Sequence, residues 1–194
     1  MVLREKSENM SFKGVSSVPC PPPAGIDLTP RQKLIGAVDI NINRDGTWHH
    51  QGAPFTRHAL VKLFASVLRR DNDGHHWLIT RAEAARITVE DAPLLAVEMR
   101  RREKDGVPVL SFRTNVDTWI DAGPDRPLRI EEASDGEPRP YLVVADDGLE
   151  ARLLPAVFYD LAEQAFEGDI NGKARYVVES NDARFDIGAT EETA

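Results

Sequence analysis

Apolar residues follow a helical spacing in two segments of this chain. From Thr56 to Arg70 they come three and four residues apart, which predicts a helix capped by Thr56 with one buried face formed by Leu60, Leu63, Phe64, Val67 and Leu68. The same spacing between residues 154 and 166 predicts a second amphipathic helix. A Thr29–Pro30 step, typical of a helix start, predicts a further short helix over residues 30–37.

Elsewhere apolar and polar residues alternate, which predicts short β-strands. Strands are expected at residues 39–43, 47–51, 75–80, 86–91, 94–99, 107–113, 118–122, 128–132 and 141–145, and two more follow the second helix. Asp-Gly pairs at positions 45–46 and 105–106 predict tight hairpin turns. The predicted fold class is therefore α+β, with mainly antiparallel sheets and one helix on each of two sheets.

The second half of the chain resembles the first. Residues 57–64 share a pattern with residues 152–159, about 95 positions later, and the pentad Ala-Arg-Ile-Thr-Val at 85–89 resembles Ala-Arg-Phe-Asp-Ile at 183–187. Such a period predicts duplicated helix-plus-strands units. We expect a seam between the units, and seams are favoured places for ligands.

Composition suggests three segments along the chain. Residues 1–28 are polar and then rich in proline, which predicts a mobile arm. Residues 29–93 form the expected N-terminal repeat unit. Residues 94–194 form the expected C-terminal antiparallel sheet with the second helix.

Charge and cysteine content limit the classes of function. The net charge is −8, which argues against nucleic acid or anionic membranes as partners because both attract basic surfaces. The single cysteine, Cys20, cannot form an internal disulfide and fits a reducing compartment. No apolar run has the roughly 18 residues that a membrane span needs. A cytoplasmic location is expected.

Five histidines lie within one stretch of the sequence, which raises the question of a metal site. His49 and His50, like His75 and His76, are adjacent, and adjacent strand residues point to opposite faces. No zinc-binding spacing, phosphate loop or nucleophile elbow is present. We therefore predict no metal, cofactor or catalytic residue, and expect these histidines to be exposed or hydrogen-bonded.

Polar residues around the end of one predicted strand are the best candidates for ligand binding. Arginines could bind a phosphate or carboxylate through two parallel hydrogen bonds, while hydroxyl and carboxylate groups could hold a sugar or base. The alternative is that they form internal salt bridges that only stabilise the fold. The candidates are Arg57, Thr80, Arg81, Glu83 and Asp91, with Arg152 and Tyr159 as their counterparts in the second copy.

Three stretches carry a family resemblance: residues 48–69, Trp77–Thr80 with Glu83, and Ile87–Pro93. Together they resemble a bacterial family, domain of unknown function 1285 (DUF1285), over roughly residues 30–188. The resemblance implies a duplicated core, a C-terminal half superficially like a pleckstrin-homology domain, and a role in signalling without assigned enzymatic activity. It also implies a small-molecule site, for a nucleotide-like ligand, at the seam. Thr80–Arg81 departs from the Thr-Pro step expected of the family.

These observations lead to one hypothesis and two alternatives. The hypothesis is a regulatory or signalling module that binds a small anionic, nucleotide-like ligand between its repeats. The first alternative is a protein-interaction scaffold, since an exposed strand edge can accept a strand from a protein partner. The second is a metal-dependent hydrolase that uses the histidines with Asp or Glu. The oligomeric state is not predicted.

Overall fold

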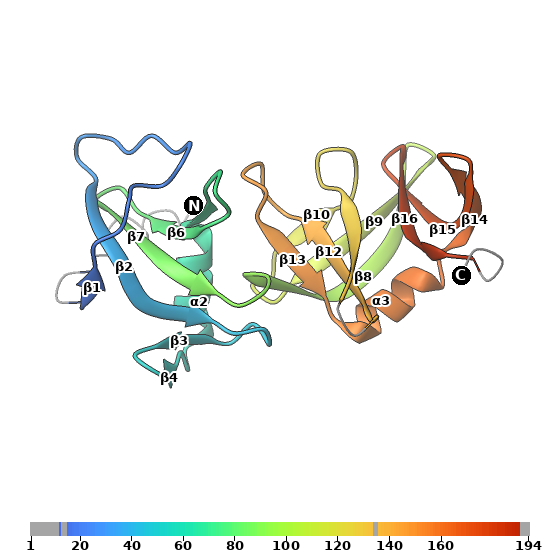
Figure 1. The fold of residues 1–194 in the computed structure, drawn as a ribbon. Coiled ribbons are helices and arrows are strands. Elements are labelled where there is room, and N and C mark those ends of the chain that lie inside the picture. Colours follow the sequence, from blue (N-terminus) through green and yellow to red (C-terminus); the bar gives the residue numbers. More distant parts are fainter. Residues whose placement is uncertain (1–11, 13–14, 134–135, 191–194) are drawn as a thin grey trace. The chain divides into compact units, whose positions relative to one another are not determined.

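The computed structural model describes residues 12, 15–133 and 136–190 (Figure 1). The chain divides after Pro93 into two compact units, residues 1–93 and 94–194, here called unit 1 and unit 2. The described residues are mainly β-strand, with two helices and both mixed and antiparallel sheets, so the α+β prediction is confirmed.

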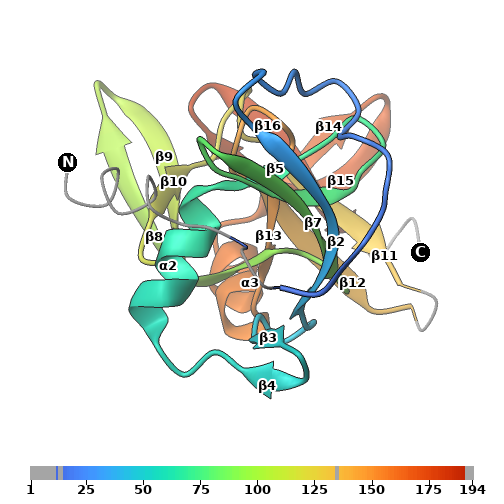
Figure 2. The same cartoon turned by 90° about the vertical axis from the view of Figure 1, so that its left-hand side faces the viewer.

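Unit 1 is a mixed sheet with one helix. Its strands lie in the order β4-β3-β2-β7-β6-β5. The short strand β1 also pairs with β2, at Ala37 and Val38. All pairs are antiparallel except β2 with β7, which run parallel. Helix α2 lies on one face of this sheet (Figures 1 and 2). The elements are β1 (Ser17–Val18), β2 (Lys33–Ile42), β3 (Trp48–His50), β4 (Ala53–Pro54), α2 (His58–Ser66), β5 (Leu68–Arg70), β6 (His76–Ile79) and β7 (Glu83–Val89).

Unit 2 has two sheets. The larger has six strands in the order β10-β9-β8-β13-β12-β11, with β8 and β13 parallel, and the smaller is the antiparallel sheet β14-β15-β16. Helix α3 connects the two sheets along the chain. The elements are β8 (Leu94–Lys104), β9 (Val107–Thr114), β10 (Trp119–Asp121), β11 (Leu128–Glu132), β12 (Pro138–Val143), β13 (Glu150–Leu153), α3 (Pro155–Ala162), β14 (Phe166–Ile170), β15 (Lys173–Ser180) and β16 (Ala183–Ala189).

The two units share one strand topology. Each contains two successive groups of three strands, β2–β4 with β5–β7 in unit 1 and β8–β10 with β11–β13 in unit 2. In each, the first strand of the first group runs parallel to the last strand of the second group at the centre of the sheet. The predicted duplication is therefore confirmed at the level of the fold.

The residue correspondence that suggested the duplication is wrong. By position in the sheet, the counterpart of β7 is β13, whereas the pentad at 183–187 lies in β16, at the edge of the smaller sheet. Likewise, α2 lies between the third and fourth of the six strands that the units share, β4 and β5, but α3 follows the sixth, β13. Similar alternating or helical patterns arise wherever a strand or helix has one buried face, so short matches do not identify equivalent positions.

The sequence was right about both Asp-Gly hairpins and wrong about some boundaries. Residues 33–37, predicted as part of a helix, instead form the first half of β2. The strand predicted at 39–43 forms the rest of β2, where Val38, Ile40 and Ile42 alternate into the core. The cap of α2 is Arg57, not Thr56, and α2 ends at Ser66, so Val67 and Leu68 are buried beyond it. Helix α3 also ends early, and Phe166 begins β14.

An aromatic cluster joins α2 to the sheet of unit 1. The ring of Phe64 on α2 lies 6.0 Å from Trp48, 5.5 Å from Phe55 and 6.3 Å from Phe12 between centroids. Trp48 and Phe12 are almost wholly buried. Such tilted aromatic contacts add to the burial of the rings and hold the helix to the sheet.

The described part of the expected proline-rich arm is packed on unit 1. The backbone N–H of Phe12 donates to the buried carboxylate of Glu83, and β1 pairs with β2. Farther along, the carbonyl oxygen of Ala24 accepts from the N–H of Asn72 at 3.0 Å. Residues 1–11 and 13–14, which also belong to the expected arm, lie outside the described residues.

The two sheets of unit 2 are joined by Ser180, at the end of β15. Its hydroxyl is fully buried, donates to the carbonyl oxygen of Ala122 at 2.7 Å and accepts from the N–H of Leu110 at 2.9 Å. Asn181 adds a second bond to the same Ala122 oxygen at 2.6 Å. A likeness of unit 2 to a pleckstrin-homology domain stays a prediction. Neither helix in the described part of the chain is long and apolar enough to cross a membrane.

Candidate binding site

Thr80 and Glu83, two of the predicted ligand residues, lie at the two ends of the turn between β6 and β7. The Thr80 hydroxyl accepts from the backbone N–H groups of Ala82 and Glu83, at 3.2 and 3.0 Å, and donates to the carbonyl oxygen of Glu83 at 3.1 Å. Both side chains are over nine-tenths buried, and the Glu83 carboxylate holds the N–H of Phe12. Their polar groups therefore stabilise the turn and the N-terminal segment.

The other predicted residues of unit 1 lie around this turn and the helix start. Arg81 is exposed at the tip of the turn, and Asp91 is half-buried just after β7. Arg57 is exposed at the start of α2, where its side chain makes no capping bond. The sequence prediction that these groups bind a ligand stays a prediction.

Arg152 and Tyr159 belong to unit 2. Arg152 lies on β13, opposite Tyr141 of β12 and Leu95 of β8. Tyr159 lies on α3 with 71% of its surface exposed. Binding of a ligand at a seam between the units stays a prediction.

The histidines lie on several elements of unit 1. His49 and His50 lie on β3 and His76 on β6, while the imidazole of His75 lies 3.5 Å from the carboxylate of Asp71. Over the described ranges, no three His, Cys, Asp or Glu side chains are placed so that they could hold one metal ion.

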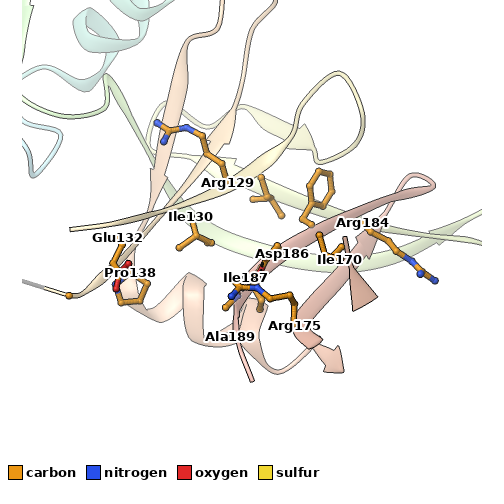
Figure 3. A pocket seen from close by; sticks show the side chains of 14 residues that line it. Arg129, Ile130, Glu132, Pro138, Ile170, Arg175, Arg184, Asp186, Ile187 and Ala189 are labelled. Atoms are coloured by element: carbon orange, nitrogen blue, oxygen red, sulfur yellow. Dashed lines mark hydrogen bonds and ion pairs between the residues drawn. The ribbon is translucent and has the colours of Figure 1, made fainter. Parts of the chain in front are cut away.

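Unit 2 contains a cavity of about 640 Å³ between its two sheets (Figure 3). This is within the usual size range of small-ligand sites. One wall is β11 with the start of β12, and the other is β16 with parts of β14 and β15. The lining residues are Leu128, Arg129, Ile130, Glu132, Gly136, Pro138, Ile170, Arg175, Arg184, Phe185, Asp186, Ile187, Gly188 and Ala189.

The three arginines that line this cavity differ in how their guanidinium groups are bonded to carboxylates and in where those groups extend. Arg129 makes two hydrogen bonds to the carboxylate of Glu150, which raise its pKa above the ordinary value although burial opposes this. Its guanidinium and that of Arg184 extend away from the centre of the cavity (Figure 3). Arg184 donates to Glu179 at 2.8 Å.

Arg175, on β15, is the third arginine that lines the cavity. It lies beside Asp186 and Ile187 (Figure 3) and donates from Nε to the Asp186 carboxylate at 2.7 Å. Its two terminal nitrogens have no hydrogen-bond partner among the described residues. The side chain is 30% exposed, so these donors are open to a ligand. A guanidinium already held at Nε can bind an anion with little loss of conformational freedom.

The cavity also contains free strand edges. Within the described ranges, β11 pairs with β12 alone and β16 with β15 alone, although β11 and β16 are neighbours. The N–H of Val143 donates to the carbonyl oxygen of Pro127, and the N–H of Ala133 donates to that of Glu137. These two bonds show which residues of β11 direct their backbone groups toward β12. In an antiparallel pair, residues whose backbone groups bond to the partner strand alternate with residues whose groups point away from it. The backbone N–H and C=O groups of Leu128, Ile130 and Glu132 therefore point away from β12. These three residues line the cavity.

Two family models together match residues 29–187 of the chain. The model described as the N-terminal domain of DUF1285, a domain of unknown function, matches residues 29–92, and the model of the C-terminal domain matches residues 93–187. The chain belongs to the DUF1285 family. The resemblance seen in the sequence is thereby confirmed.

Solved structures of other DUF1285 proteins are similar to this chain. One, from Silicibacter pomeroyi DSS-3, is 31% identical with a TM-score of 0.76, and the match covers 98% of this chain and 97% of the other. Another, from Shewanella baltica OS155, is 29% identical with a TM-score of 0.51 and covers 64% of this chain and 91% of the other. A search of curated proteins finds no match.

Sequence reasoning missed the cavity residues of unit 2. The strand at 128–132 was predicted, but nothing in it shows that its outer edge faces β16 across a cavity. Arg175 and Asp186 are 11 positions apart on neighbouring strands, and their pairing depends on an irregular register near Tyr176 and Val177. No local pattern predicts such an irregularity, because it depends on packing between sheets.

Proposed function

We propose that this DUF1285 protein is a binding module that receives an anionic ligand in the cavity of unit 2, where the ligand's negative group contacts Arg175. The observation that carries this proposal is that the two terminal nitrogens of Arg175 have no hydrogen-bond partner among the described residues. They lie beside apolar lining in a cavity of about 640 Å³. A carboxylate or phosphate oxygen is the natural acceptor for these donors.

The lining supports a ligand that is partly apolar. Ile130 is half-buried and lines the cavity together with Phe185 and Ile187, each 7% exposed, and the Asp186 carboxylate is paired with Arg175 Nε. The ligand therefore needs only one negative group near Arg175 and an uncharged portion along the walls. A nucleotide-like compound is one member of this class.

The proposal assigns no catalytic residue. Binding of a ligand or partner without chemistry is the simplest basis for a regulatory or signalling role, and it keeps the function expected from the sequence while placing the site within unit 2. The seam between the units, and the residues first predicted to bind there, remain the alternative location.

Thermal shift and calorimetry with a panel of anions test this proposal. The panel contains adenosine and guanosine mono-, di- and triphosphates, inorganic phosphate and medium-chain carboxylates. We expect at least one to raise the melting temperature of the wild type, since ligand binding stabilises the folded state. Arg175→Gln should abolish this shift.

Arg113→Gln is the matched control. Arg113 is a paired arginine of unit 2 with a similarly exposed side chain, 33%, and it lies on β9 outside the cavity. The proposal is wrong if no anion, free or carried by a peptide, binds in a way that depends on Arg175. Binding that Arg57→Gln removes and Arg175→Gln leaves intact would place the site in unit 1.

A further inference from the structure

We infer that the ligand is an extended peptide segment of another protein, which adds to the free edge of β11 as a new strand and places one acidic side chain against Arg175. This inference rests on the proposed function and names the class of partner that the same cavity takes. The argument comes from the backbone of β11, the side chains of the cavity and its charges.

The backbone of β11 offers a regular row of groups that bond to no other described residue. Leu128, Ile130 and Glu132 each direct one N–H and one C=O away from β12. The groups recur every second residue, which is the repeat of an extended peptide chain. A compact small molecule can satisfy only one or two of these groups, whereas a strand of about five residues can bond to all of them.

The cavity also provides surfaces for alternate side chains of such a strand. Ile130 and Pro138 lie on one wall, and Phe185 and Ile187 lie on the other. Alternate side chains of an added strand point to the same side, so every second residue of the peptide can pack on this apolar surface. Main-chain bonds would then supply affinity, and the apolar positions would supply specificity.

Charge distinguishes which peptides fit. The terminal nitrogens of Arg175 favour a carboxylate, while Glu132 lies at the end of the row of backbone groups and disfavours a second acid there. The protein as a whole carries a net charge of −8, which opposes strongly acidic peptides. The matching partner is therefore a mainly apolar strand with a single acidic residue.

The test uses a library of random seven-residue peptides displayed on phage and selected on the intact protein. An enriched peptide is synthesised, and its dissociation constant is measured by calorimetry against the wild type, Arg175→Gln and Arg113→Gln. We expect Arg175→Gln, or replacement of the peptide's acidic residue by its amide, to weaken binding about tenfold or more. Arg113→Gln should leave the affinity unchanged.

Two measurements distinguish an added strand from any other pose. Methylation of single peptide nitrogens should weaken binding at every second residue, because only alternate N–H groups face β11. Hydrogen exchange should slow at Ile130 and Glu132 of the protein on binding, while Arg129 and Glu131, already paired with β12, should change little.

The outcomes separate the two proposals. A peptide that needs Arg175 but shows no two-residue period overturns strand addition and leaves the binding function standing. The same holds if small anions bind at Arg175 and no peptide is enriched. If the enriched peptides bind with the expected period but are indifferent to Arg175 and to their own acidic residue, the acidic recognition is overturned. If nothing binds in an Arg175-dependent way, both proposals fall.

Discussion

The indole nitrogen of Trp77 donates a hydrogen bond to the carboxylate of Asp71 at 2.8 Å, and both residues are at least 97% buried. The same carboxylate accepts from the backbone N–H groups of Asp73 and His75, at 3.1 and 2.7 Å, and from that of Ala24 at 3.4 Å. It thus ties the turn after β5, the neighbouring strand and the N-terminal segment together. Burial opposes ionisation, but the hydrogen bonds outweigh it and lower the pKa of Asp71 below its ordinary value.

Asp71→Asn should destabilise unit 1 by roughly 1.5–3 kcal/mol at neutral pH, because hydrogen bonds to a charged acceptor are replaced by weaker or unmatched ones. Since the folded pKa lies below the unfolded one, this stabilisation is present above the ordinary pKa of about 3.8 and disappears as the pH falls through the folded pKa. The difference from wild type should therefore shrink below about pH 4. Urea unfolding between neutral pH and about pH 3 measures it.

Asp73→Asn is the control for this variant, since Asp73 is exposed in the same turn. It should change stability by less than about 0.5 kcal/mol. If both variants behave alike at every pH, the Asp71 carboxylate does not organise this turn.

Gly36→Ala should destabilise unit 1 by more than about 2 kcal/mol. Gly36 has a φ of +104°, and a Cβ at this position would lie 2.4 Å from the carbonyl oxygen of Val18 on β1. The new methyl group would strain the backbone and push β1 from β2. Gly52 has a φ of +76° and open space around it, so Gly52→Ala should lower the stability of unit 1 by only about 1 kcal/mol. If chemical denaturation shows equal losses of unfolding free energy for the two variants, the close approach of β1 to Gly36 does not contribute to the cost.

Phe12→Ala tests whether the N-terminal segment belongs to the core of unit 1. Phe12 is 4% exposed and contacts Phe64, so its loss should cost about 3 kcal/mol, as for other buried phenylalanines. Val18→Ala, at a residue 67% exposed on β1, should cost less than about 0.5 kcal/mol. A freely moving arm would instead leave the unfolding midpoint of both variants at the wild-type value.

Ser180→Ala should destabilise unit 2 by about 1–3 kcal/mol, because the N–H of Leu110 and the carbonyl oxygen of Ala122 lose a buried partner. The neighbouring change Glu179→Ala removes only a surface pair with Arg184 and should cost less than about 1 kcal/mol. Hydrogen exchange of Leu110 should accelerate in the first variant alone. Unchanged exchange would mean that other contacts hold the two sheets together.

The spacing of apolar and turn residues along the sequence predicted the elements that pack against segments adjacent to them in the chain. The hairpin around Asp105 and Gly106 is such a case, because turn chemistry and alternation agree there. The predicted helix over 30–37 is wrong. A Thr-Pro step is only a weak preference for a helix start, and here the chain forms β2, whose second half contains the alternating Val38, Ile40 and Ile42. Thr80 and Glu83 were predicted to bind a ligand. In the structure the Thr80 hydroxyl bonds within the turn and the Glu83 carboxylate accepts from the N–H of Phe12.

The sequence by itself determined the α+β class, the two units of similar design, the family and the positions of most strands, since these depend on periodicity, turn residues and motifs along the chain. Only the tertiary structure decided which strands are equivalent and that β2 and β7 run parallel, as do β8 and β13. It also decided that β11 and β16, each at the edge of its described sheet, line one cavity with Arg175. The physical reason is that strand pairing and side-chain convergence join residues far apart in the sequence. Alternation shows which residues share a face, but it carries no information about which strand lies alongside.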